Sequence, residues 1–324
     1  MTKDTFREGI PYMRKFASLL GAAALGVVLA AAAAKAEDIR IVMVTHGQAA
    51  SGFWSVAKKG ADDADADFAD TVVEYRSPET YDMVAMAQLI DAAVASKPDG
   101  LAVSIPDPDA LGPSIKAAIA AGIPVISLNS GVEVAKDLGV KVHVGQTELI
   151  AGIGGGEAMK AAGVTKAACV NLEVGNVALD LRCEGFGQGL GTTPDIIATT
   201  IDPTEVKNAV TAYLTNNPDT QALFILGSDP AMPAVEAVEG LGLIGKVRLA
   251  TFDLSEGILE AVRDGKMDFA IDQQQYLQGY LPVALLRLYK KFGLMPGADV
   301  LTGPGLVTKD NAASVIDWSK QGYR

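Results

Sequence analysis

The sequence predicts an α/β protein with two doubly wound parallel-sheet domains. Short apolar runs alternate with helical patterns over most of the chain. The short runs are apolar throughout, which is typical of parallel strands that helices cover on both faces. Because no Gly/Ser-rich or Pro-rich linker separates the two halves, we expect strand ends, not a flexible tether, to join the domains.

The first half of the alternation predicts five strands and four helices. The strands are expected at residues 39–44, 72–75, 100–103, 124–128 and 140–144, and the helices at 53–68, 83–96, 111–121 and 149–162. Asp109 is expected to cap the third helix, and Gly122 to end it.

The second half of the chain shows the same alternation of predicted strands and helices. Its strands are expected at residues 167–171, 196–200, 222–226, 247–251 and 269–271, and its helices at 177–190, 204–216, 231–239 and 256–263. Ser255 is expected to cap the last of these helices, and Gly265 to end it.

One glycine-rich stretch, Gly152-x-Gly154-Gly155-Gly156, lies inside a predicted helix. A dinucleotide fingerprint needs its glycines at the turn between a strand and a helix, so this stretch predicts close helix packing instead. The GxxxxGK[ST] and GxSxG motifs of phosphate-binding loops and serine hydrolases do not occur.

The N-terminus has the three parts of a secretory signal. Arg14-Lys15 is followed by an apolar run over residues 16–34 and then by Ala34-Lys35-Ala36, whose small side chains suit signal peptidase. We therefore expect residues 1–36 to be removed and the mature protein to begin at Glu37 outside the cytoplasm. The alternative is a permanent membrane anchor, but no basic stop-transfer flank follows the run.

The charge balance argues against nucleic acid and anionic lipid as partners. The chain has 27 Lys and Arg against 39 Asp and Glu, a net charge of −12, and residues 1–36 hold five of the basic but only two of the acidic residues. Phosphate groups need a basic surface. The sequence therefore favours a freely diffusing soluble protein.

No metal or cofactor is expected. Two His and two Cys are too few for a typical zinc site. Asp63, Asp65, Asp67 and Glu74 have the spacing of a calcium loop, but Phe68 stands where the loop needs Gly. The acidic run is expected to be the solvated face of a helix.

Cys169 and Cys183 lie in one predicted strand-to-helix unit of an exported protein. An oxidising compartment favours a disulfide between them. Two separate buried thiols remain the alternative.

Polar residues recur at the carboxyl ends of the predicted strands, where open α/β sheets bind ligands. These residues are His46, Ser104, Asn129-Ser130, Glu173, Asn176, Ser228-Asp229, Asp253 and Asp272-Gln273. Phe53 and Trp54 begin the first helix, where one of them could simply pack in the core. Aromatic plates together with Asp, Asn, Arg and Gln are what a carbohydrate requires, because a sugar presents apolar C–H faces and a rim of hydroxyls.

Several separated motifs resemble the periplasmic sugar-binding proteins of ribose-type ABC importers, which have the type I periplasmic binding protein fold. They include SGFWSVAKKGAD (51–62), LDLRCEGF (179–186), ILGSDPA (225–231), QYLQGY (275–280) and the longer segments 98–131 and 249–274. The resemblance implies two Rossmann-like lobes joined by a three-crossing hinge. It places residues 37–146 and 275–304 in the N-terminal lobe, and residues 147–274 and 305–324 in the C-terminal lobe.

The resemblance also implies a ligand site between the lobes. Phe53 and Trp54 would stack on a monosaccharide or related polyol, and the hydroxyls would be held by the polar residues of both lobes. These are His46, Ser104 and Asn129, then Arg182 or its neighbour Asp180, with Ser228, Asp229, Asp253 and Gln273. Ser104 and Asn129-Ser130 depart from the Asn and Asp-Arg common at these positions, so the sugar itself stays open.

Together these expectations describe a monomeric, non-catalytic periplasmic receptor that delivers a sugar to an inner-membrane ABC permease. A chemoreceptor is a second partner that the resemblance admits. The alternative is a secreted carbohydrate-active α/β enzyme in which Asp180, Asp229 and Asp253 are acid–base groups. A ligand-sensing transcription regulator has a related fold, but it would carry a helix-turn-helix and no export signal.

Overall fold

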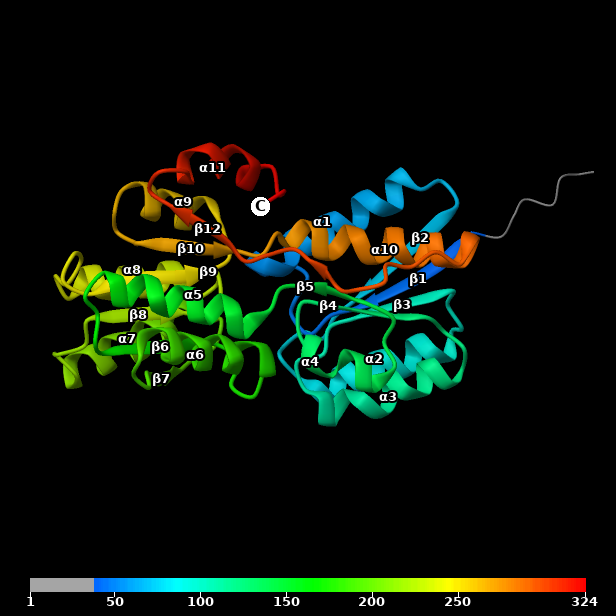
Figure 1. Cartoon of the computed structure of the whole chain (residues 1–324), viewed down its shortest axis with the longest axis horizontal. Coiled ribbons are helices and arrows are strands. Elements are labelled where there is room, and N and C mark those ends of the chain that lie inside the picture. The colour runs from blue at the N-terminus through cyan, green and yellow to red at the C-terminus, as the bar shows by residue number, and fades with distance from the viewer. Residues whose placement is uncertain (1–37) are drawn as a thin grey trace, which may run out of the picture. The chain divides into compact units, whose positions relative to one another are not determined.

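The computed structural model describes residues 38–324, which form two six-stranded sheets with helices on both faces (Figure 1). In the first strand, β1 (Ile39–Val44), Ile41 and Met43 enter one apolar core, and Val42 and Val44 enter another. Successive side chains of a strand point to opposite faces, so a continuously apolar strand fills two cores at once.

The first sheet has the strand order β11-β5-β4-β3-β1-β2, and all its neighbouring strands are parallel. Besides β1, its strands are β2 (Thr71–Arg76), β3 (Gly100–Val103), β4 (Val125–Leu128), β5 (His143–Gly145) and β11 (Val300–Leu301). Its helices are α1 (Gly52–Asp67), α2 (Met83–Ala95), α3 (Pro108–Ala120), α4 (Val132–Leu138) and α10 (Gln275–Phe292). We call this sheet with its helices the first lobe.

The second sheet has the order β12-β10-β9-β8-β6-β7, parallel except for the antiparallel β12. Its strands are β6 (Ala167–Asn171), β7 (Asp195–Ala198), β8 (Ala222–Ile225), β9 (Arg248–Phe252), β10 (Phe269–Asp272) and β12 (Gly305–Thr308). Its helices are α5 (Glu148–Ala161), α6 (Val177–Leu190), α7 (Pro203–Asn216), α8 (Ala231–Gly240), α9 (Glu256–Arg263) and α11 (Ala312–Lys320). We call this the second lobe.

The chain passes between the lobes three times: from β5 to α5, from β10 to α10, and from β11 to β12. The first and third crossings lie together, because the Thr302 amide donates to the Gly145 carbonyl at 2.7 Å. The predicted fold, two doubly wound lobes with three crossings, is confirmed.

Helices α5 and α6 lie in backbone contact. A Cβ added at Gly156 would stand 2.2 Å from the Phe186 carbonyl oxygen, and one at Gly189 would stand 2.1 Å from that of Ile153. Only glycine permits such an approach. The prediction that the glycine-rich stretch serves helix packing is confirmed.

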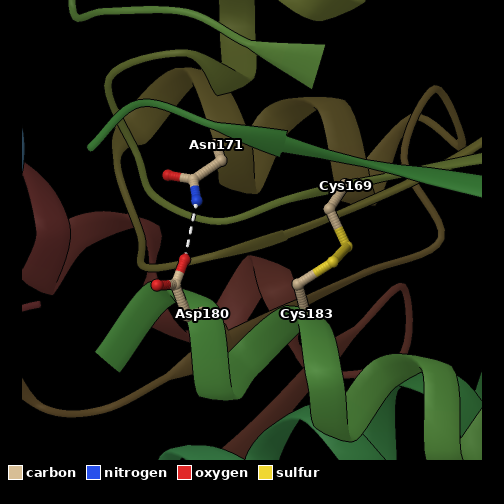
Figure 2. Close-up of a disulfide and its surroundings, with 4 residues drawn as sticks. All are labelled: Cys169, Asn171, Asp180 and Cys183. Carbon is tan, nitrogen blue, oxygen red and sulfur yellow. Dashed lines mark hydrogen bonds between the residues drawn. A yellow bond between two sulfur atoms is a disulfide. The ribbon is translucent and has the colours of Figure 1, made fainter. Parts of the chain in front are cut away.

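The disulfide joins the same two elements that the sequence pattern linked. Cys169 on β6 is bonded to Cys183 on α6, with their Cα atoms 6.0 Å apart (Figure 2). A hydrogen bond of 3.4 Å from Asn171 Nδ2 to Asp180 Oδ1 also joins this strand to this helix. Covalent and polar contacts therefore both fix the start of α6 against the sheet.

One helix cap was predicted wrongly. Asp107, not Asp109, caps α3, because the Asp107 side chain accepts from the Asp109 and Ala110 amides and Pro108 can open the helix. Ser255 does cap α9, and Gly122 and Gly265 do end their helices at φ of +82° and +76°.

The acidic run on α1 is not simply a solvated face. Tyr276 and Tyr280 of α10 donate to Asp63 and Asp67 at 2.9 and 3.0 Å, and Asp65 accepts from the Val73 amide at 2.6 Å. These carboxylates therefore bind α1 to its neighbours. The predicted signal peptide lies outside the described residues. No helix in residues 38–324 combines the length and hydropathy needed to cross a membrane.

Candidate functional site

A cavity of about 680 Å³ is lined by residues of both lobes. Nine of the predicted site residues line it: His46, Phe53, Trp54, Asn129, Arg182, Ser228, Asp229, Asp253 and Gln273. Most of them follow the carboxyl ends of β1, β4, β8, β9 and β10. Parallel strands bring these ends to one edge of each sheet, which is why residues far apart in sequence meet here.

Aromatic rings form part of the cavity lining. The Trp54 ring meets the edges of His46 and Phe53, each at a centroid distance of 4.8 Å, and Tyr81 meets His46 at 5.9 Å. A Cβ at Gly47 would fall 1.8 Å from Trp54 Nε1, so glycine makes room for the indole. Phe53 and Trp54 are also buried members of the first-lobe core. They serve packing and line the cavity at the same time.

Arg182 is fully buried and has a fixed orientation. Its Nε and Nη2 donate to the two carboxylate oxygens of Glu148 at 2.7 and 3.1 Å, and its Nη1 donates to the Leu226 carbonyl at 2.7 Å. Its guanidinium lies 4.2 Å from the centre of the Phe252 ring. Burial opposes this charge, but Glu148 outweighs the penalty and raises the pKa of Arg182.

Asp253 and Asn129 both have left-handed backbones, with φ of +69° and +62°. Such conformations in residues other than glycine concentrate at functional sites. Gln273 links the two, since its Nε2 donates to Asp253 at 2.7 Å and its Oε1 lies 3.5 Å from Asn129 Nδ2. Burial raises the pKa of Asp253 to about 7, against the opposing charge of Arg182 and the hydrogen bond from Gln273.

Polar contacts also run directly between the lobes at this cavity. His46 Nε2 lies 3.4 Å from a Glu173 oxygen and 3.4 Å from Asn176 Nδ2. The Gly52 amide donates to Asp229 at 3.1 Å. Burial disfavours the Glu173 charge, but His46 and Asn176 hold its pKa below the usual value, whereas burial raises the pKa of Asp229.

Two predicted residues do not line the cavity. Ser104 lies behind His46, where its Oγ accepts from the His46 amide at 3.0 Å and stands 2.9 Å from Nδ1. Asp180 is turned to Asn171 instead. In contrast, Ser228 lines the cavity, and its buried Oγ has no hydrogen-bond partner among the described residues.

The sequence analysis missed Gln48, Tyr81 and Glu148, and it singled out Glu173 as a strand-end residue without including it in the site. Gln48 and Tyr81 line the cavity from loops, and Glu173 follows β6. Glu148 opens α5, where an acidic residue has an ordinary explanation in the helix dipole. Nothing local distinguishes it from such a residue.

Known proteins with similar sequence include sugar-binding proteins. The xylose/arabinose-binding protein XylF of Sulfolobus acidocaldarius is 25% identical over 307 residues, covering 88% of this chain and 76% of that protein. The ribose import binding protein RbsB of Salmonella typhimurium is 29% identical over 268 residues, covering 81% and 87%. These relatives give no support to the enzyme alternative.

A solved structure with a similar sequence and fold is also that of a carbohydrate-transport protein. A carbohydrate transporter from Acidothermus cellulolyticus, in complex with myo-inositol, is 36% identical, with a TM-score of 0.84 over 89% of this chain and 100% of that chain. The family model described as a periplasmic binding protein domain matches residues 41–293. Since the match spans both lobes and every cavity residue discussed above, this chain belongs to the periplasmic binding protein domain family.

Proposed function

We propose that this protein is the exported receptor of an ABC importer, and that it binds a neutral monosaccharide or cyclic polyol between its lobes. One observation carries the proposal: an indole, a buried carboxylate and an unpartnered hydroxyl, at Trp54, Asp253 and Ser228, share one cavity. The ring can cover an apolar sugar face, while the oxygens accept from hydroxyls. The myo-inositol bound to the Acidothermus relative is a neutral cyclic polyol, which is the class of ligand proposed here.

Ligand binding would shift the two lobes toward a closed form that the inner-membrane permease recognises. The lobes are proposed to comprise residues 37–146 with 275–304, and 147–274 with 305–324. The mature protein would act as a monomer in the periplasm after loss of residues 1–36, and would return its ligand chemically unchanged.

A thermal-shift screen of pentoses, hexoses, deoxysugars and inositols tests the proposal. A ligand that binds only the folded protein stabilises it by about 2.7 kcal/mol at a hundredfold excess over Kd. We expect one or a few neutral compounds to raise the melting temperature, and chromatography to recover them intact. A screen without any shift would argue against a sugar receptor, and conversion of the compound would support the enzyme instead.

A further inference from the structure

Arg182 is the only Lys or Arg among the cavity-lining residues of the described chain. Four carboxylates line the same cavity, those of Glu173, Asp202, Asp229 and Asp253. Among the Lys and Arg side chains, only Arg182 can therefore attract a negatively charged ligand into this cavity.

Glu148 already occupies the side of Arg182 best suited to a carboxylate. Its two oxygens accept from Nε and Nη2, which is the bidentate arrangement that a carboxylate ligand would adopt. The Leu226 carbonyl accepts from Nη1. Of the five guanidinium N–H groups, two are left, enough for single hydrogen bonds to hydroxyls.

The position of Glu148 is itself fixed from the crossings. It is 1% exposed, it is the first residue of α5 after the β5 crossing, and it does not line the cavity. Gln146, on the crossing itself, donates to Glu148 Oε2 at 2.9 Å. The crossing therefore fixes the position of the Glu148 carboxylate, which in turn fixes the Arg182 guanidinium.

We propose that Glu148 is a positioning residue that makes the cavity selective for uncharged polyols over their carboxylate- or phosphate-bearing counterparts. It does so by orienting Arg182 and by neutralising its charge before any ligand arrives. An anionic ligand would then face the Glu148 charge and the lining carboxylates with no free cation to offset them. The inference rests on the proposed function, because it concerns the selectivity of the same site.

Glu148→Gln tests the proposal, because glutamine keeps the length of the side chain and removes its charge. Calorimetry would compare each neutral compound with its anion: D-glucose with D-glucuronate, D-galactose with D-galacturonate, and myo-inositol with its 1-phosphate. The pair used is the one whose neutral member binds the wild type. We expect the affinity for the neutral compound divided by that for its anion to fall in Glu148→Gln. The fall should be on the order of tenfold or more, because the variant loses one unit charge at this range.

Glu133→Gln is the matched control, because it removes a carboxylate that lies near Glu148 and has no contact with Arg182. Its preference should equal that of the wild type. A folded Glu148→Gln protein with wild-type preference would overturn the proposal, as would an equal fall in the control.

Glu148→Asp covers the case in which the glutamine variant does not fold. Aspartate keeps the charge but is too short to reach both guanidinium nitrogens in the same geometry. We expect weaker binding of the neutral compound, with the rejection of its anion retained, and wild-type affinity would refute the positioning role. Failure of the wild type to bind any neutral compound would instead count against the proposed function, so the two failures are distinguishable.

Discussion

Asp253 combines three unusual properties in one residue: a left-handed backbone, nearly complete burial and a raised pKa. The left-handed backbone costs free energy, and burial disfavours the ionised carboxylate in the free protein. Residues retained under such conditions are expected to contribute to binding.

Replacing Asp253 with alanine should therefore weaken ligand binding without unfolding the protein. A hydrogen bond to a charged group contributes about 1.5 to 3 kcal/mol, which corresponds to a loss of roughly ten- to a hundredfold in affinity. Isothermal titration with the ligand from the screen measures it. Asp180→Ala removes a carboxylate outside the cavity and should leave the affinity unchanged; the reverse pattern would assign the role to Asp180.

Affinity should also depend on pH through Asp253. Hydroxyls that donate to its carboxylate favour the ionised form, so binding lowers a pKa that is about 7 in the free protein. Affinity should be highest above that pH and fall, by up to about tenfold per pH unit, as the pH drops below it. Titrations across this range check it, and Asp253→Asn should flatten the profile. A profile that persists in Asp253→Asn would exclude Asp253 as the titrating group.

The same raised pKa has the opposite effect on folding. The folded protein holds the proton more tightly than the unfolded chain, whose pKa stays near 3.8. The stabilisation is therefore complete below that lower value and is lost as the pH rises toward 7. Low pH is therefore expected to stabilise the fold of the free protein and to weaken ligand binding.

At the scale of elements, the contact between α5 and α6 depends on glycines such as Gly156, whereas Gly154 on the same helix is exposed. A Cβ at Gly154 would have no atom within 4 Å, whereas one at Gly156 would collide with the Phe186 carbonyl. The two positions are two residues apart and chemically identical in sequence. Comparing alanine at the two positions therefore separates the effect of helix packing from the effect of intrinsic helix propensity.

Gly156→Ala should destabilise the protein by roughly 1–3 kcal/mol, because the two helices must move apart. Gly154→Ala should stabilise it by roughly 0.5–1 kcal/mol, because alanine loses less backbone entropy in a helix. Chemical denaturation of both variants measures the free energies of unfolding. Equal effects would mean that the helices are not in backbone contact.

The bond between Cys169 and Cys183 closes a loop across 14 residues and should stabilise the second lobe by roughly 3 kcal/mol. Thiol titration of the unfolded, unreduced protein should find no free thiols, and reduction should lower the melting temperature. Two titratable thiols in the exported protein would exclude the bridge.

For the whole molecule, we propose that export to the periplasm is accompanied by removal of residues 1–36. We expect N-terminal sequencing of the secreted protein to begin at Glu37, on the pattern at Ala34-Lys35-Ala36. Recovery of an uncleaved chain in the membrane fraction would contradict the periplasmic location.

The sequence by itself determined the fold class, and nine of the eleven predicted site residues line the cavity. Hydrophobic periodicity distinguished strands from helices, and a parallel sheet places all strand ends at one edge, so local pattern alone could assign His46 and Asn129 to the ligand edge of the first sheet and Asp253 to that of the second. That the two edges form one site was anticipated only through the resemblance. That α10 packs in the first lobe was predicted only from the resemblance, because nothing in the sequence of α10 indicates which sheet it packs against.

Only the tertiary structure decided which side chains touch. It turned Asp180 toward Asn171 and away from the cavity, placed Ser104 behind His46, and set Glu148 against Arg182 across 34 positions of sequence. Periodicity reports which face of an element is buried, because burial depends on the local alternation of apolar and polar residues. Pairing between distant side chains depends on how the helices and strand-end loops pack within each lobe, and no local pattern encodes that geometry.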